Sequence, residues 1–153
     1  MTNQRTLKKR NGNVADIIGS MFCLMMLLIV VCVGINAMKI MQVKMGVDRV
    51  VRTGSLLLEE QGTLSTADIT TLLDTLANDG FTTVEVTVNG SLVYTGSGTA
   101  VEAPRATYGQ ECSIGIVATA YASDLHLFNA GSVWNNEWTF NSNAVTVSKA
   151  RQL

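Results

Sequence analysis

The feature that most constrains this chain is an apolar run near its N-terminus, DIIGSMFCLMMLLIVVCVGINAM, from Asp16 to Met38. After Asp16, no charged residue occurs before Lys39. At about 1.5 Å per residue, a helix over this run is roughly 30 Å long, which matches the hydrocarbon core of a bilayer. A soluble domain rarely needs a helix that is apolar on every side. The run therefore predicts a membrane-spanning helix.

The residues before the run set its expected orientation. Arg5, Lys8, Lys9 and Arg10 lie among the first 12 residues, where no acid occurs. The positive-inside rule then predicts a cytoplasmic N-terminus and a C-terminal part outside. The run is about twice as long as the apolar core of a secretory signal peptide, and no small-residue cleavage site follows it. We therefore expect the span to be retained.

Asp16 stands where the apolar run begins, and its position alone leaves two interpretations open. An unpaired carboxylate in hydrocarbon is costly, so this side chain needs the interface or a partner of opposite charge. In the first interpretation it caps the helix at the headgroup level and gains about 1 kcal/mol or less from the helix dipole. In the second it meets the N-terminal amine of a neighbouring subunit when several spans pack together.

The junction Lys-Lys-Arg-Asn-Gly, followed by three small or polar residues, Asp16 and the apolar run, resembles the leader of type IV pilin-like proteins. Its short form resembles the tight-adherence (TadE-like) minor pilins, over residues 8–61. The resemblance implies that a prepilin peptidase cuts between Gly12 and Asn13, and that Asp16 serves assembly. After that cut Asp16 is the fourth residue, whereas the family usually carries a glutamate at the fifth.

The helix is expected to continue beyond the membrane as an amphipathic stalk. Its apolar positions recur at intervals of three and four residues, with charged residues on the other face. These positions are Ile40, Val43, Val47, Val50, Val51, Leu57 and Leu58. We predict one helix from about Val14 to Gln61, ended by Gly62. The organisation is then a basic leader (1–12), a transmembrane and stalk helix (13–62) and an exported domain (63–153).

The exported domain is predicted to be α+β. Ser65 and Asp68 form a capping-box pattern that begins a second helix. Apolar residues then alternate over residues 84–88, and Asn89-Gly90 is a strong hairpin signal. Further alternation starting at Cys112, with separate strands at 133–140 and 144–148, gives about five strands in an antiparallel sheet that packs on the helices.

Composition argues against several classes of function. Residues 53–148 hold ten acidic residues and one basic residue, Arg105, so this part does not attract nucleic-acid phosphates. His126 has no histidine or cysteine at ligand spacing, which argues against a metal. Solvated surface positions explain Asp74, Asp79 and Glu85 better than a catalytic pair does. We therefore expect no enzyme, no catalytic residue, no cofactor and no small-molecule substrate.

Three further side chains of the domain are predicted to pack inside the fold or at its edge. Cys112 is the one cysteine after the span and shares its parity with Ile114, which predicts a buried thiol rather than a disulfide. Trp134 and Trp138 lie on one side of a predicted strand, which favours core or edge packing over a sugar platform.

Two functions remain. The first is a structural pilin or pseudopilin that packs through its N-terminal helix into a surface filament or a secretion-linked pseudopilus. Its partners are then the membrane, other copies or pilin-like subunits, and a prepilin peptidase. The alternative is a single-pass, membrane-anchored binding module outside the cytoplasm. Both place the protein in the cell membrane with its C-terminal domain outside.

Overall fold

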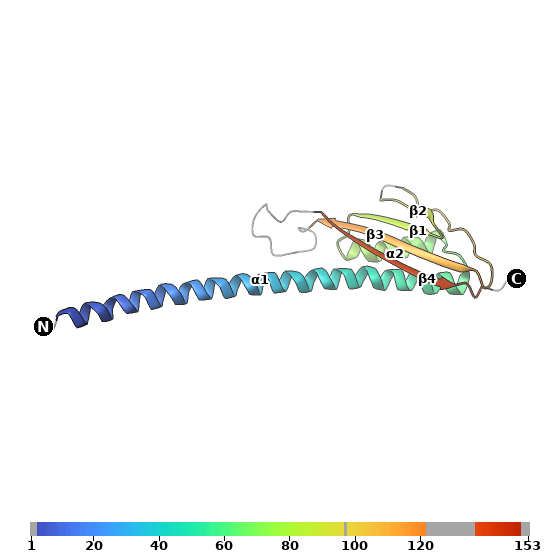
Figure 1. The fold of residues 1–153 in the computed structure, drawn as a ribbon. Coiled ribbons are helices and arrows are strands. Elements are labelled where there is room, and N and C mark those ends of the chain that lie inside the picture. The colour runs from blue at the N-terminus through green and yellow to red at the C-terminus, as the bar shows by residue number, and fades with distance from the viewer. Residues whose placement is uncertain (1–2, 97, 122–136, 151–153) are drawn as a thin grey trace. The chain divides into compact units, whose positions relative to one another are not determined.

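The computed structural model describes residues 3–96, 98–121 and 137–150, with side chains from Val14 onward (Figure 1). The chain divides into two compact units, Met1–Met38 and Lys39–Leu153. The long helix α1 (Asn3–Gln61) contributes to both and is followed by α2 (Thr66–Asn78). The strands are β1 (Thr83–Val88), β2 (Ser91–Tyr94), β3 (Glu111–Tyr121) and β4 (Glu137–Val147). The α+β prediction is confirmed.

Helix α1 begins at Asn3, earlier than the predicted start near Val14. The basic stretch before Gly12 consists mainly of residues with good helix propensity and contains no proline. Extending an existing helix fixes one residue for each hydrogen bond gained, so propagation is far cheaper than nucleation. One interior glycine, at a cost of about 1 kcal/mol relative to alanine, does not end such a helix.

The second unit has two layers, an antiparallel sheet with strand order β2-β1-β3-β4 and a layer of helices (Figure 1). The last part of α1 and all of α2 pack on one face of the sheet. The core comes from both helices and from the inward side chains of the strands. It includes Val47, Val50, Val51, Leu58, Ile69, Leu72, Leu76, Val86, Val88, Ile114 and Ile116. The predicted stripe of the stalk is thus the stripe that packs against the sheet.

Local signals place α2 and the first hairpin as predicted. The backbone N–H of Asp68 donates to Ser65 Oγ at 3.2 Å, and Ser65 N–H donates to Asp68 Oδ2 at 3.1 Å, which completes the capping box. In the β1–β2 turn, Asn89 and Gly90 have φ values of 52° and 75°. Positive φ at both residues is typical of the type I′ turn that suits a two-residue hairpin.

The described sheet has four strands, so the prediction of about five strands is wrong. The two strands predicted at 133–140 and 144–148 are represented by a single strand, β4, within residues 137–150. Asn141, Ser142 and Asn143 resemble a turn in sequence, but they continue the alternation of exposed and half-buried positions. They pair in register with Val117, Ile116 and Gly115, because β3 is long enough to pair with the whole of β4.

Gly54 allows α1 to approach the sheet closely. A Cβ atom at this position would lie 2.6 Å from Ile114 Cδ1 and 3.2 Å from Leu72 Cδ1. The glycine therefore provides the space in which β3, α1 and α2 meet. A glycine inside a helix costs about 1 kcal/mol relative to alanine, and at position 54 it contributes to core packing.

Candidate functional site

The first unit presents an apolar helical surface. Every side chain from Val14 to Val31 is exposed, and the large apolar ones among them keep between 46% and 70% of their surface accessible. Soluble monomers rarely expose a contiguous apolar patch of more than a few hundred Å². In length and composition this helix is able to cross a membrane. The candidate functional site is therefore this surface, residues 14–31, which needs an apolar environment.

The predicted processing and assembly residues lie in or beside this surface. Gly12 and Asn13 are within α1, and their side chains lie outside the described part of the structure. Asp16 is exposed on the first turn of the apolar surface. One turn further on, the hydroxyl of Ser20 donates to the Ile17 carbonyl at 2.8 Å. That hydrogen bond satisfies the hydroxyl within the helix, as an apolar environment requires.

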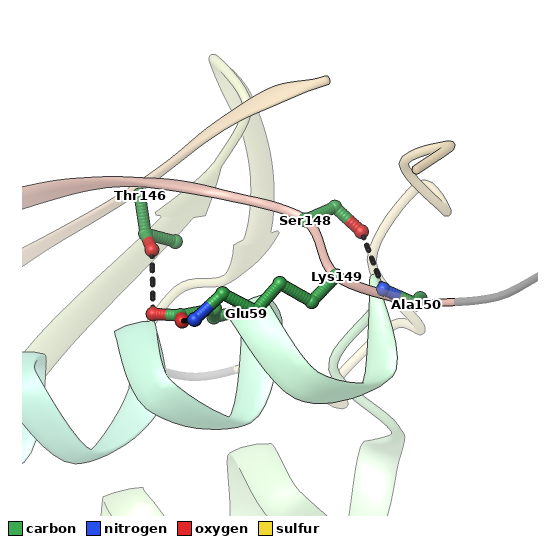
Figure 2. Close-up of polar contacts among 5 residues, drawn as sticks. All are labelled: Glu59, Thr146, Ser148, Lys149 and Ala150. Carbon is green, nitrogen blue, oxygen red and sulfur yellow. Dashed lines mark hydrogen bonds and ion pairs between the residues drawn. The ribbon is translucent and has the colours of Figure 1, made fainter. Parts of the chain in front are cut away.

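The later part of α1 is attached to the C-terminal residues of the domain (Figure 2). Glu59 forms an ion pair with Lys149 and accepts a hydrogen bond from Thr146 Oγ1 at 3.0 Å. The Lys149 backbone N–H also donates to the Glu59 carbonyl at 2.7 Å. This carbonyl lies in the last turn of the helix, where carbonyls lack intrahelical partners. The contacts join the C-terminal end of α1 to the end of β4 and the segment that follows it, and we call them the C-terminal clasp.

The ion pair of the clasp shifts the pKa of both of its members. The hydrogen bond from Lys149 is the main cause that lowers the pKa of the Glu59 carboxyl, and Thr146 adds to it. The same hydrogen bond raises the pKa of the Lys149 amine. Both shifts favour the charged forms, so the clasp is an ion pair at neutral pH.

Gly62 makes the clasp sterically possible. Its φ is +73°, and a Cβ atom here would lie 2.8 Å from both the Ala106 carbonyl oxygen and Ala150 Cβ. Its N–H donates to the Leu58 carbonyl at 2.9 Å, which ends α1 as predicted. Residue 62 thus serves both as the helix stop and as the point where the C-terminal segment crosses the end of the helix.

The described residues do not bring acids or metal ligands together. Asp74, Asp79 and Glu85 are exposed on different elements, namely α2, its C-terminal end and β1. Among the residues that the structure describes, no three potential metal ligands lie together. His126 and Trp134 lie outside the described residues, and Trp138 is half-buried beside the core.

Cys112 is buried, as predicted, with 1% of its surface accessible. Its thiol lies 3.5 Å from the Gln110 carbonyl oxygen, to which it donates a weak hydrogen bond. Burial raises the pKa of this thiol and so disfavours the reactive thiolate. An open depression beside it, lined by Asn89, Gln110 and Ser113 among others, contains no basic side chain that would activate a nucleophile.

The sequence located the apolar surface but not the clasp. Glu59 and Lys149 are far apart along the chain, and a single glutamate and a single lysine carry no pairing signal. The one local signal was Gly62, because a residue without a side chain allows another segment to pack against the end of the helix. Comparison with protein-family models, with curated proteins and with solved structures finds no match. Function must be inferred from the exposed apolar helix and from the domain that holds its far end.

Proposed function

We propose that this protein is a structural subunit of the pilin or pseudopilin kind. The segment before Lys39 spans the membrane, and copies pack together through it. The observation that carries this proposal is the exposed apolar surface at residues 14–31 on a helix whose later part is built into a folded domain. A subunit of a helical assembly needs these two parts, one to pack with neighbours and one to display outside.

Charge supports a single orientation for this subunit. The basic residues before Gly12 stay in the cytoplasm, and the acidic domain is exported. In the assembled form, a prepilin peptidase has cut between Gly12 and Asn13, and the new amine at Asn13 pairs with Asp16 of a neighbouring copy. Gly12 lies inside α1 and weakens the helix locally, which favours the opening that a peptidase needs.

The second candidate is a membrane-anchored binding module, because a span joined to a compact domain also fits an anchor. An anchor needs only hydrophobic length, whereas an assembly subunit needs specific contacts between spans. The two functions therefore differ in whether copies associate through residues 14–31. Neither depends on catalytic groups.

The proposal is tested on full-length protein produced in its own host. We expect an intact mass that lacks residues 1–12, a first residue of Asn13, and a ladder of cross-linked oligomers in the membrane or in sheared surface material. If uncut protein still forms the ladder, cleavage after Gly12 is contradicted but assembly of copies is not. Protein that stays monomeric under cross-linking at native abundance would contradict assembly and favour the anchored module.

A further inference from the structure

The two edges of the sheet differ in how they are protected. Strand β2 has four residues, its register with β1 shifts between Val86 and Thr87, and its Val93 carbonyl accepts a hydrogen bond from Val101 N–H at 2.9 Å. Strand β4 has eleven residues and pairs with β3 without a shift. We call the side of β4 that faces away from β3 the β4 edge. Within the described residues, no strand pairs with it.

The register shows which backbone groups lie on the β4 edge. Directly after β4, Ser148 N–H donates to the Gln110 carbonyl at 2.9 Å. Antiparallel partners alternate between hydrogen-bonded and non-hydrogen-bonded pairs, so the even-numbered residues of β4 bond to β3. The odd-numbered residues direct their N–H and C=O groups to the β4 edge. These residues are Glu137, Thr139, Asn141, Asn143, Val145 and Val147.

The β4 edge lacks the features that usually prevent further pairing. Natural edge strands are short, bulged, or carry lysine or proline. The one charged residue of β4 is Glu137 at its start, and from Trp138 to Val147 the sequence is WTFNSNAVTV, with no charge, proline or glycine. Asn and Thr at the outward positions keep this edge soluble without blocking its backbone. The edge is therefore able to accept another strand.

The helix beneath the β4 edge carries basic side chains. Ser142 Oγ donates to Asp48 Oδ1 at 2.6 Å, which places this face of α1 under β4. Lys44 and Arg52 lie one turn before and one turn after Asp48 on the same face. Both side chains are exposed, and neither takes part in an ion pair that the structure describes. We call Lys44 and Arg52 the basic flank. If another strand paired with the β4 edge, the side chains on its inward face would lie over the basic flank.

We propose that the β4 edge binds an extended segment of another protein by strand addition, and that this segment carries acidic residues four positions apart on its inward face. Arg52 follows Lys44 by eight positions of the helix, or about 12 Å, and four positions of a strand cover about 13 Å. Backbone hydrogen bonds supply affinity in this mode of recognition, and the alternating side chains supply specificity.

Charge also decides against a second copy of this chain as the occupant. Two β4 edges paired antiparallel around Ser142 would bring the two flanks with Lys44 and Arg52 together, and like charges repel. An acidic segment complements the same flank. The proposal goes beyond the structural function and does not depend on it, because all the residues concerned belong to the second unit, Lys39–Leu153.

The test uses full-length protein in lipid nanodiscs and a labelled peptide, TEVTVET, whose two glutamates are four residues apart. The matched control is TKVTVKT. We expect the acidic peptide to bind with a Kd of about 1 mM or below, and the basic peptide to bind at least about fivefold more weakly, the difference expected from one exposed ion pair. Hydrogen exchange should slow at Asn141, Asn143 and Val145, whose N–H groups lie on the β4 edge.

One substitution separates strand addition from simple charge attraction, and a pair of charge reversals tests the contribution of Arg52. Asn143→Pro removes an edge N–H but no bond to β3, and proline is tolerated at such positions. It should abolish binding while Cys112 stays protected from labelling, which shows that the fold is intact. Arg52→Glu should weaken binding at least about fivefold, and Arg105→Glu, with the same change of charge elsewhere, should not.

The opposite results would overturn the proposal. They are undetectable binding of TEVTVET at about 1 mM, equal binding of both peptides, or unchanged binding after Asn143→Pro. Concentration-dependent dimers that Asn143→Pro abolishes would identify a second copy as the occupant and would also overturn it. If Asn143→Pro fails to fold, hydrogen exchange at Asn141 and Val145 with and without TEVTVET decides strand addition: unchanged exchange at saturating peptide would overturn it. The Arg52→Glu and Arg105→Glu pair then decides the part played by charge.

Discussion

The two parts of helix α1 have the same secondary structure and opposite environments. From Val14 to Val31, every side chain is exposed although nearly all are apolar. Between residues 47 and 58, the apolar stripe is buried against the sheet, with Val47 and Leu58 fully covered. The second part therefore has its partner within the chain. The first part finds none among the described residues of the chain, and in length and composition it is able to cross a membrane.

This difference shows what each part of the sequence encodes. A stripe at helical spacing with polar residues opposite encodes a helix with one packed face. Apolar residues on all sides encode a helix that is surrounded. The comparison predicts that the same substitution will have different effects on the two parts.

The largest effect is expected from a charge placed in the apolar surface. Leu27 and Leu56 lie on the same helix and keep 64% and 56% of their surface accessible. Leu27→Lys should disfavour membrane insertion by about 3 kcal/mol, because a lysine near the bilayer centre is costly. Leu56→Lys should leave insertion unchanged and alter the free energy of unfolding by about 0.5 kcal/mol or less.

Membrane insertion is measured by the fraction of each variant that resists alkaline extraction, and unfolding by urea denaturation. Similar behaviour of Leu27→Lys and Leu56→Lys in extraction would show that residues 14–31 do not lie in lipid. The contrast between the two parts of α1 would then require a protein partner for the first part.

The second largest effect is expected at Gly62, at the end of the part of α1 that packs against the sheet. Gly62→Ala should lower the free energy of unfolding by about 2–3 kcal/mol, because it adds a left-handed backbone penalty to a clash with Ala106 and Ala150. Gly90 has a similar φ of +75°, but an added Cβ there would meet no atom within 4 Å. Gly90→Ala should cost only about 1–2 kcal/mol.

Urea denaturation of the two glycine variants measures both values, and their difference isolates the steric part. Equal losses would mean that the C-terminal segment does not press on Gly62. In that case the clasp would not hold the end of the helix.

Two thiols report the two environments directly. Cys23 is exposed on the apolar surface, whereas Cys112 is buried in the domain. In nanodiscs, a lipid-soluble maleimide should label Cys23 and a water-soluble one should not. Cys112 should label slowly with either reagent until urea unfolds the domain. Rapid labelling of folded Cys112 would contradict its burial and indicate a surface thiol.

The raised pKa of Cys112 also predicts how stability depends on pH. Its pKa in the folded state lies above the unfolded value, so the folded domain holds this proton more tightly. The resulting stabilisation is fully present below the unfolded pKa, near pH 8.5, and is lost as the pH rises through the folded pKa. Cys112→Ser should reduce this loss in urea denaturation between about pH 8 and 10.

The smallest effect is expected at the ion pair of the clasp, which is partly exposed. The lowered pKa of Glu59 means that its stabilisation is present above the unfolded pKa and is lost as the pH falls through the folded value. Glu59→Gln should therefore flatten the pH dependence of the urea midpoint on the acid side, from near pH 4.5 downward. Lys149→Met should show the same flattening, and an unchanged slope in both variants would rule out the pair as its source.

Local patterns in the sequence predicted much of the fold. The capping box at Ser65, the Asn89-Gly90 turn and the inward parity of Cys112 depend on neighbouring residues, and the structure confirms each of them. The continuity of β4 was not predicted, because it depends on pairing with a strand far away in the chain. By itself, an Asn-Ser-Asn sequence resembles a turn. In the structure these three residues are extended because they pair with β3.

The same distinction applies to the candidate site. The apolar surface is a property of one segment and is visible in composition alone. The clasp and the charged flank beneath the β4 edge bring together residues far apart in sequence, such as Asp48 with Ser142. Such contacts follow from topology, which one sequence does not specify.

Assembly of copies through the first part of α1 depends on Asp16, so substitutions at this residue test it. In a packed assembly, a carboxylate about 4 Å from an amine gains about 4 kcal/mol at an effective dielectric constant of 20, before the cost of desolvation. Asp16→Asn and Asp16→Ala remove this charge, whereas Asp16→Glu keeps it. None of the three changes the basic residues that set the topology.

The measurement is the yield of cross-linked oligomers in sheared surface material and membranes from cells that produce each variant at equal levels. We predict wild-type insertion and topology for all variants, loss of oligomers for Asp16→Ala and Asp16→Asn, and partial retention for Asp16→Glu. Wild-type oligomer yield from Asp16→Ala would contradict the claim. Asp16 would then be a helix cap at the membrane surface, and the protein a membrane-anchored module.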